Sequence, residues 1–445
     1  MTRSFSELIE KKKQGHELTD EELGFWIDGV VQGSIPEYQT SAMLMAVYFR
    51  GMSPRETSRL TYCIAHSGDV VDLSSLKGIK ADKHSSGGVA DTVSIPLIAV
   101  AASCGALMPK MSGRGLGHTG GTIDKLEAIP GFNVNLTPTA FMDIVSRLGG
   151  AIIAQTNDIA VADKKLYALR DVTATIDSVP LIASSIMGKK LASGADVIVL
   201  DVKWGNGAFM ETREAATGLA RTMVDIGEDN GKRTIAYVTD MNEPLGNAVG
   251  NALEVLEAVQ VLKGHGPRKL VDVILALCGE ILLQSGISPS IEDGKQQARD
   301  AIASGRALDR FAAIVEAQGG DSAFIDHPEL LPHAAVTLEV TAPRDGVIAS
   351  VDARRVGVAA MHLGAGRRTK EDAIDLGVGL TLDVKTGDTV KRGQPVAVIH
   401  ARTLDEASVC EQELNAAVSI GNAPLPAWQT IVARISRADG VTVFK

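Results

Sequence analysis

Val197-Ile198-Val199-Leu200-Asp201-Val202-Lys203 is the stretch that decides the fold of this chain. Its first four residues form a continuous apolar run, and so do Ala151-Ile152-Ile153-Ala154 and Thr234-Ile235-Ala236-Tyr237-Val238. Short runs rich in β-branched residues are typical of strands buried on both faces. The segments between them are long enough for crossover helices, so the sequence predicts an α/β sheet. Ligands of such sheets bind beyond the carboxyl ends of the strands, which makes Asp201-Val202-Lys203 a candidate edge of an active site.

Two glycine-rich segments are expected at the same edge. They read Lys83-His84-Ser85-Ser86-Gly87-Gly88-Val89-Ala90-Asp91-Thr92-Val93-Ser94 and Lys110-Met111-Ser112-Gly113-Arg114-Gly115-Leu116-Gly117-His118-Thr119-Gly120-Gly121-Thr122-Ile123-Asp124-Lys125-Leu126-Glu127. Glycine lets the backbone turn tightly and bring bare N–H groups close to a ligand. Phosphate carries about −1.5 to −2 charges near neutral pH, so it requires both cations and directed donors. Two such loops that also carry lysine and hydroxyl side chains indicate inorganic phosphate at a catalytic centre.

The composition is typical of a globular enzyme and argues against polyanionic partners. The 445 residues suffice for two or three domains, and the net charge of −10 argues against nucleic acid or an anionic membrane surface as partner. The four cysteines lie far apart without a CxxC pair, which indicates free thiols. The amino terminus has no apolar signal core, and Met43–Phe49 is too short to span a bilayer. We therefore expect a cytoplasmic protein.

The chain divides into three predicted units: a helical domain over residues 1–75, an α/β phosphate-binding domain over 76–335 and a carboxy-terminal α+β unit over 336–445. In the first, Thr19 with Glu22 and Ser53 with Glu56 form capping boxes. In the third, 336–340 and 346–351 are predicted strands with an Asp345-Gly346 turn signal between them. Residues 387–399 resemble the hammerhead strands of biotinyl and lipoyl carrier domains. The carrier tripeptides Met-Lys-Met and Asp-Lys-Ala are absent here, so a barrel-sandwich-like copy without the swinging arm is expected.

A second set of donors follows the glycine-rich segments. Ser185 and Lys189 are four residues apart and share one face if Ile182–Lys190 is helical. Arg170 offers a planar fork of donors, and Lys189 a movable ammonium. Together they are suited to a flat ligand with carbonyl edges; the alternative is a solvated helix with surface charges.

These motifs together resemble the thymidine and pyrimidine-nucleoside phosphorylase family. The resemblance rests on the second segment continued to Ile129-Pro130-Gly131, on Lys83-His84-Ser85, Arg170-Asp171 and Ser185–Lys189, and on Asp201-Val202-Lys203, in order and spacing across essentially the whole chain. It implies a helical domain joined in space by residues 160–192. It implies phosphate ligands at Lys83, His84, Ser85, Ser94, Lys110, Met111, Ser112 and Thr122. It also implies base contacts from His84, Arg170, Ser185 and Lys189, with His84, Arg170 and Lys189 as the catalytic groups.

The resemblance further implies a potassium ion and no organic cofactor. The cation positions fall on Ala90, Thr92, Leu245, Ala248 and Glu257, mostly through main-chain oxygen. A homodimer is implied as well. Two residues depart from the family pattern. Ala90 stands where glycine is usual, and a methyl group would cost about 1 kcal/mol if φ is positive there. Trp204 stands where a smaller residue is common, and its indole is expected to narrow or reshape the base pocket.

The implied reaction is phosphorolysis, in which phosphate attacks the sugar C1′ while the bond to the pyrimidine breaks. Donors on the base carbonyls stabilise the departing anion, and inversion at C1′ is expected. His84 either donates a proton or a hydrogen bond to the base, or merely bonds the loop backbone. Lysine at position 110 favours the broad enzyme that accepts uridine, thymidine and deoxyuridine.

Several alternatives stay open. They are a thymidine-restricted phosphorylase, a nucleoside-monophosphate phosphorylase, a phosphoribosyltransferase, a nucleoside or phosphate sensor without turnover, and a lysine-modified carrier. An added amino-terminal domain is usual in the second, and the third requires an acidic magnesium–pyrophosphate motif that the sequence lacks.

Overall fold

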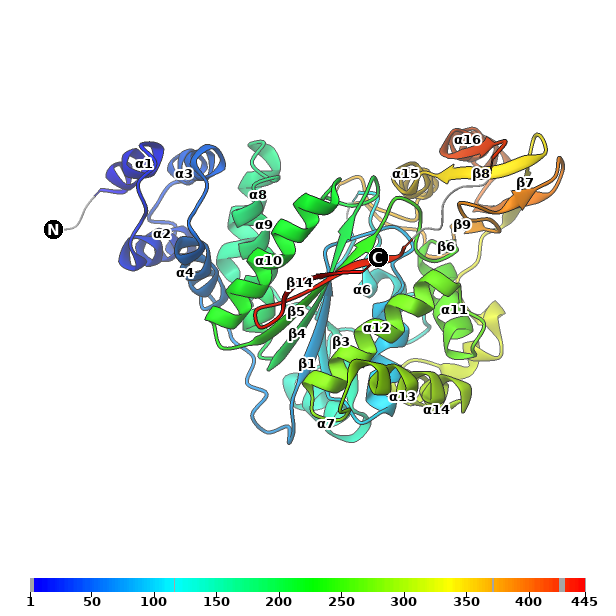
Figure 1. Cartoon of the computed structure of the whole chain (residues 1–445), viewed down its shortest axis with the longest axis horizontal. Coiled ribbons are helices and arrows are strands. Elements are labelled where there is room, and N and C mark those ends of the chain that lie inside the picture. The colour runs from blue at the N-terminus through cyan, green and yellow to red at the C-terminus, as the bar shows by residue number, and fades with distance from the viewer. Residues whose placement is uncertain (1–3, 116, 370–371, 424–428, 445) are drawn as a thin grey trace.

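The computed structural model describes residues 4–115, 117–369, 372–423 and 429–444. They form a helical bundle, a large α/β domain and a β-rich carboxy-terminal unit, which confirms the predicted fold class (Figure 1). Leu116, within the quoted glycine-rich segment, lies outside the described residues. In the described part of the chain, no helix combines the length and the apolar character that crossing a bilayer requires.

The bundle is built from two stretches of sequence. Its first four helices are α1 (Phe5–Lys13), α2 (Asp20–Gln32), α3 (Glu37–Arg50) and α4 (Pro54–Ala65). Two later helices, α8 (Val161–Val172) and α9 (Val179–Ala192), pack against α2, α3 and α4. The later pair brings the predicted base-binding side chains to the bundle.

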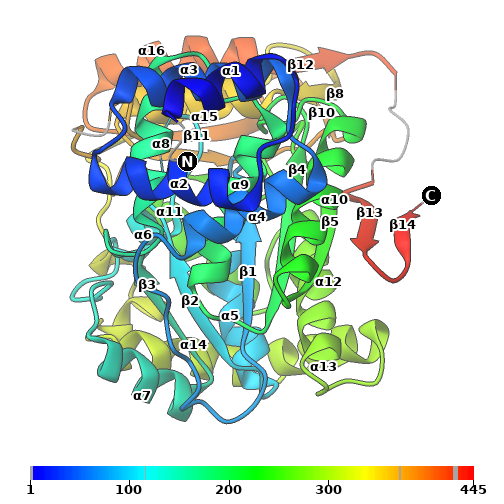
Figure 2. The ribbon, with the colours of Figure 1, turned by 90° about the vertical axis from the view of Figure 1, so that its left-hand side faces the viewer.

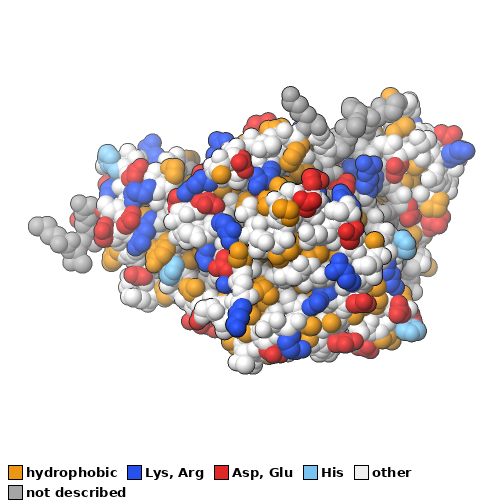
Figure 3. Space-filling view, turned by 60° about the horizontal axis from the view of Figure 1, so that its bottom comes forward, with side chains coloured by type: hydrophobic (Ala, Val, Ile, Leu, Met, Phe, Trp, Pro, Cys, Tyr) orange, Lys and Arg blue, Asp and Glu red, His pale blue; other side chains and the backbone are white. Residues whose placement is uncertain are grey.

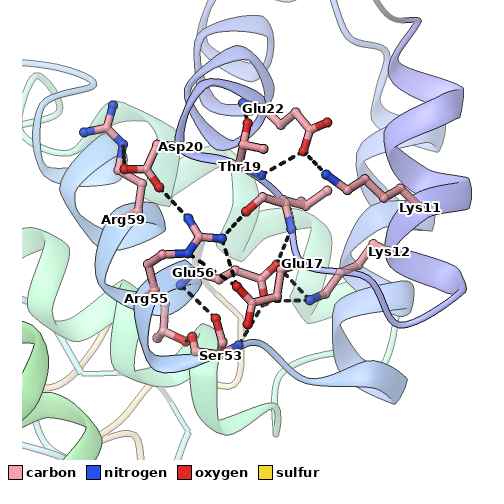
Figure 4. Close-up of polar contacts among 12 residues, drawn as sticks. Lys11, Lys12, Glu17, Thr19, Asp20, Glu22, Ser53, Arg55, Glu56 and Arg59 are labelled. Atoms are coloured by element: carbon pink, nitrogen blue, oxygen red, sulfur yellow. Dashed lines mark hydrogen bonds and ion pairs between the residues drawn. The ribbon is translucent and has the colours of Figure 1, made fainter.

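Both predicted capping boxes are present, and their glutamates link α1 to α2 and to α4 (Figure 4). Thr19 and Glu22 cap α2, and Ser53 and Glu56 cap α4, in each case with reciprocal bonds between side chain and backbone. Glu56 also accepts two bonds of 2.9 Å from Lys12 of α1 and one of 2.8 Å from the Leu18 amide. Since Lys12 and Glu56 are almost fully buried, each would be costly to leave unpaired.

The central sheet has the strand order β1-β4-β5-β13-β14. Its strands are β1 (Ala81–Ser85), β4 (Val197–Trp204), β5 (Arg233–Asp240), β13 (Ile431–Ser436) and β14 (Gly440–Val443). The first three are parallel. Alternate residues of β4 enter two different cores, with Val197 and Val199 in one and Ile198 and Leu200 in the other. The apolar run is therefore buried on both faces, as its composition predicts.

Helices cover both faces of this sheet. α10 (Arg213–Asp229) and α12 (Arg268–Gln284) contact β4 and β5 directly, and their apolar residues belong to different cores. The other elements of this domain are α5 (Ser94–Ser103), α6 (Thr122–Leu126), α7 (Pro138–Leu148), α11 (Asn251–Leu262), α13 (Ile291–Ala303) and α14 (Arg306–Ala317), followed by the 3₁₀ turns η1 (Ser322–Ile325) and η2 (Pro328–Leu330). Acidic and basic side chains are interspersed on the face shown in Figure 3. An anion site on this acidic chain therefore has to be assembled from local cations and hydrogen-bond donors.

The run at 151–154 forms a strand outside the central sheet. β3 (Gly150–Ala154) pairs in parallel with β2 (Met108–Ser112) in a separate two-stranded sheet. β2 meets β1 only near its start, where the Ala81 amide donates to the Leu107 carbonyl at 2.8 Å. Beyond that contact the two strands are not paired. Their carboxyl ends are therefore free to hold a ligand between them.

The carboxy-terminal unit contains two small sheets and two helices. One sheet has the order β6-β9-β11-β7 and the other β10-β8-β12. The strands are β6 (Ala248–Val249), β7 (Val336–Thr341), β8 (Gly346–Val351), β9 (Gly379–Leu382), β10 (Thr389–Val390), β11 (Pro395–Ala401) and β12 (Val418–Gly421), and the helices are α15 (Ala353–Leu363) and α16 (Leu404–Ala417).

Both strands predicted at 336–340 and 346–351 are present, as β7 and β8. They do not pair with each other across the turn at 345–346, because β7 pairs with β11 whereas β8 pairs with β10 and β12. For the same reason β10 and β11 of the hammerhead-like segment lie in different sheets. Turn chemistry is local, but strand partners here are set by contacts distant in sequence.

The third unit also does not extend to residue 445. β13 and β14 return to the central sheet, and β13 pairs antiparallel with β5. Arg434 of β13 donates to the buried Glu280 of α12 at 2.7 and 2.9 Å, and Tyr237 of β5 donates to the same carboxylate at 2.7 Å. This network fixes the final hairpin to the α/β domain.

Candidate functional site

A cleft of about 340 Å³ lies between the α/β domain and the bundle. The arrow of β1 points toward the bundle helices in Figure 2, and the residues at its carboxyl end line the cleft. The opposite side is lined by α8, α9 and the start of the segment between them. The cleft therefore lies beyond the carboxyl ends of the parallel strands, where the sequence places it.

Most of the residues suggested for phosphate meet on the α/β side of the cleft. The lining includes His84, Ser85, Ser94, Lys110, Ser112 and Thr122. β1 supplies the first two, β2 supplies Lys110 and Ser112, and Ser94 and Thr122 begin α5 and α6. Because β1 and β2 separate along their length, their hydroxyl and ammonium groups face one shared space.

Lys83 and Met111 do not line the cleft. Met111 is 8% exposed and packs into the core shared with the bundle. Lys83 is 1% exposed, donates to the Ser94 hydroxyl at 3.3 Å and lies 3.6 Å from the Asp201 carboxylate. Lys83 therefore supports Ser94 from outside the cleft lining.

A buried carboxylate sits between two lysines at the base of the cleft. Asp82 accepts from Lys110 at 3.3 Å and from Lys190 of α9 at 2.6 Å. Burial alone would raise the pKa of Asp82, but the two ammonium groups outweigh it and lower the pKa. Burial lowers the pKa of Lys110 to about 8, against the opposing effect of Asp82. Lys110 is thus a cation that can lose its charge in mildly alkaline solution.

The candidate edge at 201–203 supports the first glycine-rich segment without lining the cleft. Asp201 pairs with Lys203 at 2.7 Å, and the Ser86 amide donates to the Asp201 carbonyl at 3.0 Å. Burial alone would lower the pKa of Lys203, but Asp201 and Asp91 outweigh it and raise the pKa. Asp91, which does line the cleft, accepts from the Ser85 hydroxyl at 2.5 Å.

His84 is neutral at ordinary pH. Burial is the largest cause that lowers its pKa well below 6.5, and repulsion from Lys190, Lys110, Lys189 and Lys83 acts in the same direction. A neutral imidazole has one N–H donor and one acceptor nitrogen. His84 is therefore equipped to donate a hydrogen bond in the cleft, and it does not carry the extra proton of an imidazolium.

Arg170 lines the bundle side of the cleft and organises the chain that follows it. Its guanidinium donates to the carbonyls of Thr175, Ile176 and Leu181 at 3.1, 2.5 and 3.0 Å. Three of its five N–H bonds are thereby directed to the backbone. The fork thus shapes the segment between α8 and α9, in addition to facing the cleft.

Ser185 and Lys189 share one face of α9, as their spacing predicts. Lys189 donates to the Ser185 hydroxyl at 3.3 Å and pairs with Asp163 of α8 at 2.6 Å. Both cleft residues are joined on the lining by Ile182 and Ile186. A face that is partly apolar and partly polar is suited to contact with a flat heterocycle. It argues against the alternative of a solvated helix with surface charges.

Several residues of the cleft were not predicted from the sequence. They are Tyr167, Ile176, Ile182, Ile186, Phe209 and Leu219, together with Asp163 behind Lys189. The spacing of positions 182, 185, 186 and 189 already places them on one helix face, so the two isoleucines were detectable. No local signal marks Phe209 and Leu219, which reach the cleft through the fold of the α/β domain.

Trp204 is not among the described residues that line the cleft, contrary to the expectation that it narrows the base pocket. The guanidinium carbon of Arg213 lies over the Trp204 ring, 4.5 Å from the ring centroid. Ala90 does have the left-handed backbone conformation that glycine favours, with φ of 52°. The suspected strain is therefore present at Ala90.

The Ala90 carbonyl and the Glu257 carboxylate, two of the groups suggested for potassium, both lie close to Gly246. Glu257 accepts from the Asn247 and Ala248 amides through Oε1, whereas its buried Oε2 has no partner. A Cβ placed on Gly246 would lie 2.0 Å from that oxygen and 3.1 Å from the Ala90 carbonyl oxygen. The unpartnered carboxylate oxygen fits a hard monovalent cation. Among the described residues, no group of three or more His, Cys, Asp or Glu is placed to hold a metal ion.

Comparison with known protein families gives the classification. The description "Glycosyl transferase family, a/b domain" matches residues 77–308, and "Glycosyl transferase family, helical bundle domain" matches 6–68. The chain belongs to this glycosyl transferase family. A third description, "Pyrimidine nucleoside phosphorylase C-terminal domain", matches residues 347–421. This matched range ends at residue 421, which supports a carboxy-terminal unit that ends before the hairpin of β13 and β14.

Individual relatives agree with the classification. The chain is 49% identical to pyrimidine-nucleoside phosphorylase of Geobacillus stearothermophilus over 430 residues, covering 97% of this chain and 99% of the relative. It is also 49% identical to that of Staphylococcus aureus (strain MSSA476), with 94% and 96% covered. Anthranilate phosphoribosyltransferase of Thermus thermophilus shares the fold, with a TM-score of 0.58 at 19% identity over 70% of this chain and 98% of that one.

Proposed function

We propose that this enzyme catalyses the reversible phosphorolysis of pyrimidine nucleosides to free base and pentose 1-phosphate. One observation carries the proposal: a single cleft combines anion-binding groups on the α/β side with Arg170, Ser185 and Lys189 on the bundle side. The high identity to relatives with the name pyrimidine-nucleoside phosphorylase supports the same reaction.

In the proposed reaction, a phosphate oxygen attacks C1′ from the α/β side while the C1′–N bond breaks toward the bundle. The electron pair of that bond moves to the pyrimidine, and Arg170, Lys189 and the N–H of neutral His84 stabilise the resulting charge. The attacking hydrogen phosphate loses its proton as the ester forms, and that proton converts the pyrimidine anion into the free base. Attack and departure on opposite faces of C1′ invert its configuration. His84 serves as a hydrogen-bond donor because its lowered pKa leaves no extra proton to transfer.

Broad specificity is the favoured form of this activity. Lys110 lies in the cleft with its ammonium anchored by Asp82 and by the Lys83 carbonyl at 2.5 Å. An ammonium near the sugar and phosphate tolerates the 2′-hydroxyl of uridine. A thymidine-restricted enzyme is the second candidate, since the lining residues do not themselves select the sugar.

The test is the phosphate-dependent loss of uridine, deoxyuridine and thymidine, with the released base measured by chromatography. Release from all three supports the broad enzyme, and release from thymidine alone assigns the restricted one. Ligand-dependent stabilisation without any release would replace the enzyme by a nucleoside or phosphate sensor.

A potassium ion is proposed at the site of Ala90, Thr92, Leu245, Ala248 and Glu257. The unpartnered Oε2 of Glu257 supports it, and the cation would supply positive charge behind the first glycine-rich segment. Ala90 takes part through its carbonyl oxygen, which its methyl group leaves in place. Thr92 donates to Glu254 at 2.8 Å, so its hydroxyl oxygen keeps lone pairs for a cation.

A homodimer is proposed through the bundle. Tyr38 and Phe49 of α3 and Val172 of α8 are 74%, 73% and 79% exposed, and α3 contacts α8. Exposed apolar side chains gathered on adjacent helices favour association. Light scattering coupled to gel filtration measures the mass of the particle, and a mass of one chain would exclude the dimer.

A further inference from the structure

The carboxy-terminal unit forms hydrogen bonds directly with the second glycine-rich segment. The Gly117 amide donates to the Arg367 carbonyl at 2.9 Å, and the Arg367 guanidinium donates to the Gly115 carbonyl at 3.4 Å. α15 also passes close by, because a Cβ on Gly357 would lie 2.6 Å from the His118 carbonyl oxygen. Arg367 belongs to the separately matched carboxy-terminal domain, whereas Gly115 and Gly117 belong to the α/β domain.

Asp124 is the point where these contacts converge. Its side chain is 3% exposed, and its Oδ2 accepts from Arg367 at 2.9 Å and from the Gly115 amide at 2.7 Å. Its Oδ1 accepts from Arg114 at 3.0 Å. A buried carboxylate needs such donors, so removal of one of them disturbs the others.

Gly121 packs directly against Gly115, which Asp124 also contacts. A Cβ on Gly121 would lie 2.0 Å from the Gly115 nitrogen and 2.7 Å from Asp124 Oδ2. Ser112 precedes this pair of glycines and Thr122 follows it, and both line the cleft. The spacing between these two hydroxyl groups thus depends on the contacts that hold the two glycines together.

We propose that Arg367 is a positioning residue for phosphate, acting through Asp124 and Gly115. Arg367 is not among the described residues that line the cleft. Its bonds to Gly115 and Asp124 nevertheless hold the loop that carries Ser112 and Thr122. The carboxy-terminal unit thereby contributes to phosphate affinity without touching the ligand. This inference rests on the proposed function, because it assigns the phosphate to the α/β side of the cleft.

Steady-state kinetics of the full-length Arg367→Ala variant test the proposal, with uridine and phosphate varied separately. We expect the KM for phosphate to rise about tenfold or more, the effect of losing a charge-assisted bond, while the KM for uridine stays within about twofold. Arg368→Ala is the matched control, because that neighbouring side chain is 74% exposed and faces Asp372 of its own loop. It should leave both constants unchanged.

Two further measurements separate positioning from general stability. Arg367→Lys keeps the charge but loses the fork, so it should fold and give an intermediate KM for phosphate. Hydrogen exchange of the amides at Gly115 and Gly117 should be faster in Arg367→Ala than in Arg368→Ala. Asp124→Asn combined with Arg367→Ala should raise the KM for phosphate less than the product of the two single effects.

An equal rise in both KM values, or no difference between Arg367→Ala and Arg368→Ala, would overturn the positioning role. Absence of phosphorolysis in the unmodified enzyme is a different result, because it would overturn the proposed function itself. The two failures are therefore distinguishable in the same set of assays.

Discussion

A change of pH across the pKa of Lys110 is a sharp test of the proposed phosphate side of the cleft. Burial lowers that pKa to about 8, and Asp82 opposes the fall. Lys110 is therefore charged at pH 7 and loses its proton as the pH rises through about 8. Each further unit of pH lowers the protonated fraction about tenfold. Inorganic phosphate itself loses its second proton near neutral pH, so kcat/KM is expressed per phosphate dianion, and the remaining decrease reports the proton of Lys110.

The size of the effect follows from the interaction that is lost. A hydrogen bond from a charged donor contributes about 1.5–3 kcal/mol, which corresponds to about 10- to 150-fold in affinity. We expect kcat/KM for phosphate to be level near pH 7 and to fall above pH 8 with a limiting slope of −1. It should level off again after a decrease of that size. Initial rates of uracil release from uridine between pH 6.5 and 10 measure the profile.

Substitutions assign the alkaline decrease to Lys110. Lys110→Arg keeps its charge throughout this range, so the decrease should disappear while activity remains. Lys110→Gln should be flat at the low level that the wild type reaches at high pH. Lys385, whose burial also lowers its pKa to about 8, provides the control, and Lys385→Gln should retain the decrease. An unchanged decrease in both Lys110 variants would refute the reasoning.

Four further outcomes are expected. Arg170→Met leaves three carbonyls without their donor and should lower the free energy of unfolding by about 3 kcal/mol in urea titrations; full stability would contradict that role. Asp163→Asn should raise the KM for uridine about fivefold with the KM for phosphate unchanged, since the ion pair with Lys189 is partly exposed. Potassium should raise the melting temperature relative to tetramethylammonium in the wild type, and Glu257→Gln should abolish that rise. A profile extended below pH 6.5 and expressed per phosphate dianion should show no inflection near 6.5, because the lowered pKa of His84 keeps it neutral there; an inflection that His84→Asn removes would disprove this.

Much of the fold was predictable because its signals are local. The run at 197–200 is buried on both faces, and the capping boxes at Thr19 and Ser53 begin helices, as their residue types require. Strand partners were not predictable in the same way. β13 joins β5 through Arg434, Tyr237 and the buried Glu280, which lie far apart in sequence.

The same contrast between local signals and contacts distant in sequence applies to the candidate site. The glycine-rich segments and the spacing of Ser185 and Lys189 placed most lining residues, because each segment carries its own turn or helix geometry. The sequence could not show that Lys83 lies behind Ser94, because that depends on its contacts with Ser94 and Asp201, which lie farther along the chain. Nor could it show that Arg170 directs three N–H groups to carbonyls, since these belong to the segment between α8 and α9 and to the first turn of α9.

The arrangement of charge explains how an acidic chain can hold an anion. Lys110 and Lys190 are buried against Asp82, and Lys203 against Asp201, so each ammonium is desolvated and already oriented before phosphate enters. The aspartates prevent the cost of unpaired buried lysines, and the cleft needs little reorganisation when charge develops. Lys190 comes from α9 and Asp82 from β1, so one buried ion pair joins the two sides that we propose hold the pyrimidine and the phosphate. In the proposed reaction this pair keeps the two substrates aligned.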